Sequence, residues 1–103
     1  MSGRATISPE SVPVLARGVR LRFDKVRNVW TLLAPERVLM PDEIAVEILQ
    51  RCDGNATVAA IVDDLARTFA APRDEIAADV EELLQDLCDK GLVALAASGP
   101  GDG

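Results

Sequence analysis

The chain has 103 residues, a length for which one domain is the default. It contains no His and no Tyr, so the commonest general base and every His-dependent nucleophile or metal site are excluded. The two cysteines, Cys52 and Cys88, make neither a disulfide framework nor a zinc signature. We therefore expect a protein that is not an enzyme and that binds no metal and no cofactor.

Targeting signals are also missing from the sequence. No stretch approaches the roughly 18 consecutive apolar residues of a membrane helix. The first residues lack the apolar segment of a secretory signal. We therefore expect a cytoplasmic protein with no membrane partner.

The net charge of −6 is unevenly distributed along the chain. Residues 1–40 carry a charge of +4, whereas residues 41–103 carry −10. Two interpretations stay open. The two parts are solvated faces that partly neutralise each other, or one of them steers a charged partner.

The two ends of the chain have the composition of irregular segments. Residues 1–16 contain Ser, Gly and Pro, and their apolar residues fit no regular period, which indicates a flexible or loosely docked arm. Residues 97–103 are rich in Gly and predict a disordered tail. The folded domain is therefore expected at residues 17–96.

Three strands are predicted at the start of this domain. Residues 19–24 alternate apolar and charged side chains, and residues 29–33 are apolar on both faces. Pro35 suits a tight turn, after which residues 37–40 form a short third strand ended by Pro41. We expect these strands to form a three-stranded antiparallel meander.

Three helices follow, each with an apolar stripe and recognisable ends. Asp42 and Thr57 are candidate caps, and Pro72 suits the first position of the third helix. Gly54 and Gly91 end the first and third helices. Residues 92–95 then form a short apolar strand or an extended tail. The predicted fold is α+β and winged helix-turn-helix-like, with the meander preceding a three-helix bundle.

A winged helix suggests nucleic-acid binding, which is the alternative hypothesis for this chain. Residues 73–90, the would-be recognition helix, hold seven acids against Arg73 and Lys90. Such a helix is repelled by phosphates, so we expect no nucleic-acid partner. The same acids are better interpreted as a solvated helix face than as a metal site, because no other ligand type converges with them.

The third predicted strand, residues 37–40, is the last of the meander, so one of its edges should be unpaired. Arg37 and Pro41 limit the length of this edge, which is one way in which proteins block such strands. The functional interpretation is that another extended chain adds there as a new strand. A small non-enzymatic domain with an open edge beside an apolar helix is typical of a peptide-binding module.

Several segments together resemble the PqqD family over residues 17–95. They are residues 22–37 with the pattern Trp-x-Leu-Leu-x-Pro-Glu, 45–49, the Cys-Asp-Gly turn 52–54 followed by Thr-Val, and 86–92 with Asp-Lys-Gly-Leu. The resemblance implies a peptide chaperone of pyrroloquinoline quinone (PQQ) biosynthesis. Such a chaperone binds the precursor peptide PqqA and presents it to the radical SAM enzyme PqqE. The same fold recurs as the RiPP recognition element, in which a leader peptide adds antiparallel to the third strand and packs against the third helix.

The resemblance also implies which elements hold the peptide. The third strand would supply main-chain hydrogen bonds from Arg37, Val38, Leu39 and Met40. One flank of the third helix would supply the opposite wall, and at about 100° per residue this flank comprises Ile76, Asp79, Val80, Leu83 and Leu87. The choice of flank is our inference, since the family pattern does not determine it. Because an exposed edge also pairs with its own copy, we expect a monomer or a weak homodimer.

Overall fold

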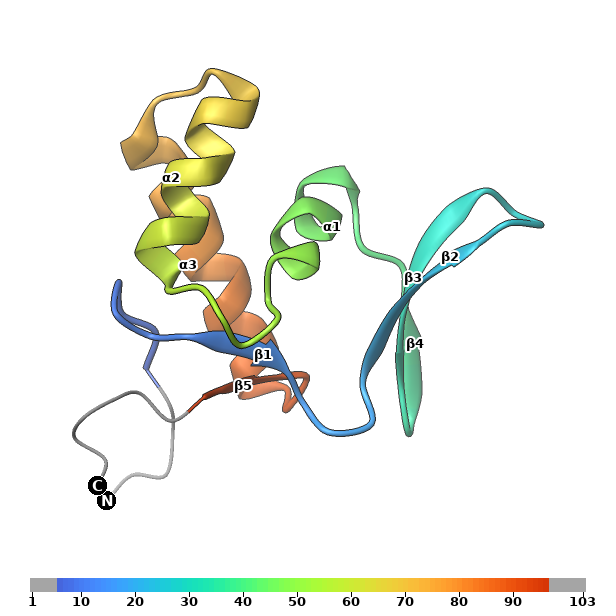
Figure 1. Cartoon of the computed structure of the whole chain (residues 1–103). Coiled ribbons are helices and arrows are strands. Elements are labelled where there is room, and N and C mark those ends of the chain that lie inside the picture. The colour runs from blue at the N-terminus through green and yellow to red at the C-terminus, as the bar shows by residue number, and fades with distance from the viewer. Residues whose placement is uncertain (1–5, 97–103) are drawn as a thin grey trace.

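A computed structural model describes residues 6–96 and shows a mixed α+β fold with antiparallel strands and three helices, which confirms the predicted fold class (Figure 1). The elements in chain order are β1 (Pro13–Leu15), β2 (Arg20–Asp24), β3 (Val29–Ala34), β4 (Arg37–Leu39), α1 (Glu43–Gln50), α2 (Val58–Phe69), α3 (Arg73–Asp89) and β5 (Val93–Leu95). None of the helices within residues 6–96 has the length and hydropathy needed to cross a bilayer. The likeness to a winged helix-turn-helix stays a prediction.

Strands β2, β3 and β4 form the predicted antiparallel meander, with β3 in the centre. The β2–β3 hairpin extends away from the helices (Figure 1). It turns at Asn28, whose φ of 61° is tolerated best by Asn, Asp and Gly. The Asp24 carboxylate accepts the backbone N–H groups of Val26 and Arg27 at 3.0 and 3.1 Å, which stabilises the turn. Phe23 and Trp30 pair across these strands as an edge-to-face contact, with ring centroids 5.3 Å apart.

Two of the helices begin at the predicted caps. Oδ1 of Asp42 accepts the N–H of Ala45 at 2.8 Å, and Oγ1 of Thr57 accepts the N–H of Ala60 at 3.1 Å. Both bonds satisfy one of the N–H groups that the first turn of a helix leaves unpaired. Pro72 lies one position before the helical residues of α3 and makes no side-chain cap.

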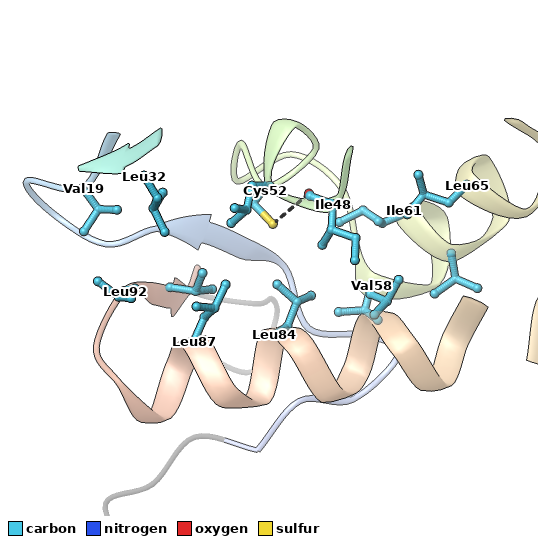
Figure 2. Packing of buried hydrophobic residues seen from close by; sticks show 14 residues of the cluster. Val19, Leu32, Ile48, Cys52, Val58, Ile61, Leu65, Leu84, Leu87 and Leu92 are labelled. Atoms are coloured by element: carbon cyan, nitrogen blue, oxygen red, sulfur yellow. Dashed lines mark hydrogen bonds between the residues drawn. The ribbon is translucent and has the colours of Figure 1, made fainter. Parts of the chain in front are cut away.

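A single apolar core lies between the helices, the meander and β5 (Figure 2). Leu84 of α3, Ile48 of α1 and Leu32 of β3 are each at most 1% exposed within it. Cys52 is also buried there, and its Sγ donates to the carbonyl of Ile48 at 3.3 Å. Burial raises the pKa of this thiol to about 12, so Cys52 is an inert packing residue at neutral pH.

The segment expected to be a loose N-terminal arm is in large part built into the fold. Strand β1 pairs antiparallel with β5, and Pro13 is buried. The carbonyls of Ser11 and Pro9 accept the N–H groups of Val58 and Ala59 at 2.8 and 3.0 Å, at the start of α2. Main-chain bonds of this kind require no apolar periodicity, which is why the pattern of residues 1–16 gave no sign of them. Residues 1–5 and the expected tail 97–103 lie outside the described part of the chain.

Candidate peptide-binding groove

A groove of about 890 Å³ lies between β4, the start of α1 and the outer side of α3. We call it the β4–α3 groove. Its lining residues are Leu32, Leu39, Met40, Pro41, Asp42, Ile44, Ala45, Ile48, Leu49, Asp79, Glu82, Leu83, Gln85, Asp86, Leu87 and Asp89. The strand and the helix that the sequence singled out therefore face the same space, although about forty residues separate them along the chain.

The outer edge of β4 has no strand paired with it in the described part of the chain. The β3–β4 loop has two residues, so the closing pair Ala34–Arg37 exchanges both of its main-chain hydrogen bonds. Hydrogen-bonded pairs alternate with non-hydrogen-bonded pairs along an antiparallel ladder, so the pair Leu32–Leu39 is hydrogen-bonded as well. The N–H and C=O of Val38, between these two pairs, point outward, where an added strand would meet them.

Five of the nine predicted site residues meet in the β4–α3 groove. They are Leu39, Met40, Asp79, Leu83 and Leu87. Met40 is 60% exposed, and Leu83 is half-buried, so both present apolar surface to an incoming chain. Leu87 is buried and contributes to the floor.

The other four predicted residues lie elsewhere. Arg37 and Val38 are exposed on β4 but do not line the groove. Ile76 and Val80 instead face a small gap against α1 and α2. Val80 is only 1% exposed, which makes it a residue of the core. One turn of α3 thus contributes to two different surfaces, a division that the apolar stripe alone did not indicate.

Helix α1 also takes part in the groove, although none of the predicted site residues lies on it. Ile44, in the first turn of α1, is 44% exposed and lines the groove. The sequence does carry a signal for this, because Ile44 and Ala45 are adjacent apolar residues and so make the apolar face of α1 wider than one packing contact requires. Pro41 and Asp42 join the wall because the chain passes directly from β4 into α1.

The chemistry of the groove is apolar at the floor and acidic at the rim. Leucine and isoleucine side chains from all of the surrounding elements form the floor. The rim carries the carboxylates Asp42, Asp79, Glu82, Asp86 and Asp89. Within residues 6–96, no three Cys, Asp or Glu side chains converge closely enough to hold a metal ion. The arrangement is suited to noncovalent binding of a chain with apolar side chains.

Comparison with known sequences identifies relatives along most of the chain. Residues 30–93 match the sequence model of the family described as coenzyme PQQ synthesis protein D (PqqD). A PqqA binding protein of Rhodopseudomonas palustris (strain HaA2) is 56% identical over 95 residues, which cover 92% of this chain and 93% of the relative. A PqqA binding protein of Xanthomonas campestris pv. campestris (strain B100) is 47% identical over 91 residues, covering 88% and 99% of the two chains.

Solved structures agree with the sequence relatives. The solution NMR structure of the PqqD truncation of Methylobacterium extorquens PqqCD is described as a functional and stand-alone RiPP recognition element. It matches with a TM-score of 0.74 and 44% identity, over 86% of this chain and 95% of that chain. The crystal structure of PqqD from Xanthomonas campestris matches with a TM-score of 0.52 and 48% identity, over 82% and 94% of the two chains. The family match, the curated relatives and the solved folds agree, and this chain belongs to the PqqD family.

Proposed function

We propose that this protein is a peptide chaperone of PQQ biosynthesis that binds the precursor peptide PqqA and presents it to the radical SAM enzyme PqqE. The observation that carries the proposal is the open edge of β4 beside an apolar groove. The names of the relatives support it, since the curated sequences are PqqA binding proteins and the Methylobacterium domain is a RiPP recognition element.

Strand addition explains how such a small domain holds a flexible peptide. The peptide would extend the meander beyond β4 and bond to the outward N–H and C=O of Val38. Every second side chain of the peptide would then point toward the groove, where Leu39 and Leu83 offer apolar contacts. Pro41 has no N–H, so the ladder is expected to stop near Met40.

The same mode of binding permits transfer of the peptide to an enzyme. Main-chain bonds demand little of the peptide sequence, and ordering a disordered chain consumes part of the interaction free energy. The bound peptide is therefore held firmly enough to be presented and loosely enough to be released. No reacting side chain is required of the chaperone.

Replacing Val38 by Pro tests strand addition directly. The change removes a donor that points away from β3, so the existing meander should keep its hydrogen bonds. We expect affinity for a synthetic PqqA peptide of the same organism to fall about tenfold, as for the loss of one well-made hydrogen bond together with local misalignment of the strand. Isothermal titration calorimetry measures the affinity, and circular dichroism reports the fold.

Val38→Ala is the matched control, because it removes the side chain but keeps the N–H. It should bind the peptide like the unmodified protein. Equal affinity of Val38→Pro and Val38→Ala in folded proteins would show that the peptide does not extend the sheet at β4. If Val38→Pro does not fold, the amide NMR shifts of β4 in the unmodified protein, compared with and without the peptide, show whether the peptide pairs with this edge.

A further inference from the structure

The rim of the β4–α3 groove is acidic along its whole helical side. Asp79, Glu82, Asp86 and Asp89 follow one another on α3 at intervals of three, four and three residues. These intervals place them on one side of the helix, and we call them the carboxylate line. Within the described part of the chain, no Lys or Arg side chain lines the groove to balance them.

The two acidic side chains in the middle of α2, Asp63 and Asp64, have arginine partners. Nε of Arg51 donates to Asp64 at 2.6 Å, and Arg73 pairs with Asp63. By contrast, neither Asp79 nor Glu82 forms a hydrogen bond or an ion pair with any residue of 6–96. Arg51, Arg67 and Arg73 thus each pair with a carboxylate of α2, whereas these two rim carboxylates stay uncompensated.

One member of the carboxylate line does have a cation nearby. Nζ of Lys90 lies 3.0 Å from Asp86, one turn further along the chain. This pair is exposed, and Lys90 itself does not line the groove. The uncompensated negative charge therefore lies mainly at Asp79 and Glu82, next to the apolar contact offered by Leu83.

We propose that the groove selects a cationic peptide, in which Lys or Arg residues flank the apolar side chains that enter the floor. This inference rests on the proposed function, since it assumes that the peptide lies between β4 and α3. Charge complementarity carries it, because carboxylates beside an apolar floor favour a ligand that brings positive charge and raise its rate of association.

The geometry indicates how many peptide residues face the carboxylate line. At a rise of about 1.5 Å per residue, the ten steps from Asp79 to Asp89 span roughly 15 Å of α3. An extended peptide advances about 3.3 Å per residue, so roughly five of its residues lie alongside. Two Lys or Arg side chains that lie on the groove side of such a segment, two or four residues apart, would both meet carboxylates of the carboxylate line.

Two adjacent glutamates of α3 provide a matched pair of variants. Glu82 lines the groove, whereas its neighbour Glu81 does not. The two side chains point about 100° apart around the helix, yet they have the same charge and lie only about 1.5 Å apart along its axis. We expect Glu82→Gln to weaken PqqA binding about two- to fivefold, the size of one exposed charge pair. Glu81→Gln should leave the affinity unchanged.

The salt dependence of binding and a charge-reversal variant complete the experiment. Affinity of the unmodified protein should fall severalfold when ionic strength rises from about 0.05 M to about 0.5 M, because exposed charges are then screened. Glu82→Lys should bind the unmodified peptide worse than Glu82→Gln does. It should recover affinity for a PqqA variant in which one Lys or Arg is replaced by Glu.

The outcomes separate this inference from the proposed function. If Glu82→Gln and Glu81→Gln bind alike and salt has no effect, the carboxylate line is a solvated face and the inference is wrong. Strand addition still holds in that event, provided that Val38→Pro weakens binding. If no variant of β4 or of the groove changes the affinity, the peptide binds elsewhere and both proposals are wrong.

Discussion

Leu83 and Leu84 are neighbours on α3 that lie in different surroundings. Leu84 is fully buried in the core, where Figure 2 shows it pointing from α3 toward the other apolar side chains. Leu83 is half-buried and lines the β4–α3 groove. A rotation of about 100° between successive residues is enough to place one leucine in the core and its neighbour on the wall of the groove.

Alanine variants of these two leucines should therefore have opposite consequences. Leu84→Ala leaves a cavity in a packed core and should lower the free energy of unfolding by about 2–5 kcal/mol. Leu83→Ala should cost less stability but weaken PqqA binding about five- to thirtyfold, since partial burial of a Leu side chain contributes about 1–2 kcal/mol. Chemical denaturation and calorimetric titration measure the two quantities. A Leu83→Ala protein with unchanged affinity would exclude this flank of α3 from the site.

At the scale of elements, Arg51 connects the end of α1 to α2. Its guanidinium donates to Asp64 of α2 and, at 2.7 Å, to the carbonyl of Glu47 in the last turn of α1. The hydrogen bond from Arg51 lowers the pKa of the Asp64 carboxyl. Arg67 lies 3.6 Å from the same carboxylate and lowers its pKa less.

This connection predicts a particular sensitivity to acid. A carboxyl group whose pKa is depressed in the folded state stabilises the fold above its unfolded pKa of about 3.9, and this contribution is lost as the pH falls through the folded value. We therefore expect the free energy of unfolding to decrease below about pH 4. Arg51→Met should make that decrease shallower, and Arg67→Met should change it little. Identical acid dependence of Arg51→Met and the unmodified protein, measured by urea unfolding, would contradict the assignment.

The sequence predicted the elements better than it predicted the surfaces between them. Caps at Asp42 and Thr57 are local signals, because each acts on an N–H three residues away. The face that Val80 presents and the outward direction of the Val38 peptide group depend on how α3 packs and on the two-residue loop before β4. These are properties of the assembled fold, and the spacing of apolar residues does not contain them.

At the scale of the whole molecule, the two ends of the described chain close the fold together. Strand β1 pairs with β5, while the meander lies apart from this small sheet (Figure 1). The N–H of Ala96 donates to the carbonyl of Val12 at 2.7 Å, and the N–H of Gly54 donates to that of Pro13 at 3.1 Å. The segment before residue 17 thus links the helices to β5, which follows α3.

Removing residues 1–16 should therefore destabilise the domain. The deletion eliminates the β1–β5 ladder and the carbonyls that accept the N–H groups at the start of α2. With about 0.5–1.5 kcal/mol for each main-chain hydrogen bond, the loss should amount to roughly 3 kcal/mol or more. Differential scanning calorimetry should then show a melting temperature lower by ten degrees or more, at about 4–8 °C per kcal/mol for a domain of this size. An unchanged melting temperature would mean that this segment is as loose as its composition suggested.

The central claim is that the peptide binds between the edge of β4 and the outer flank of α3. Titration of isotopically labelled protein with synthetic PqqA peptide, followed by amide NMR shifts, tests it most directly. We predict that the largest shifts fall on residues 37–40 and on the part of α3 around Leu83, with smaller shifts at the start of α1. Largest shifts on α2, over residues 58–69, would contradict the account and place the peptide on another face of the molecule.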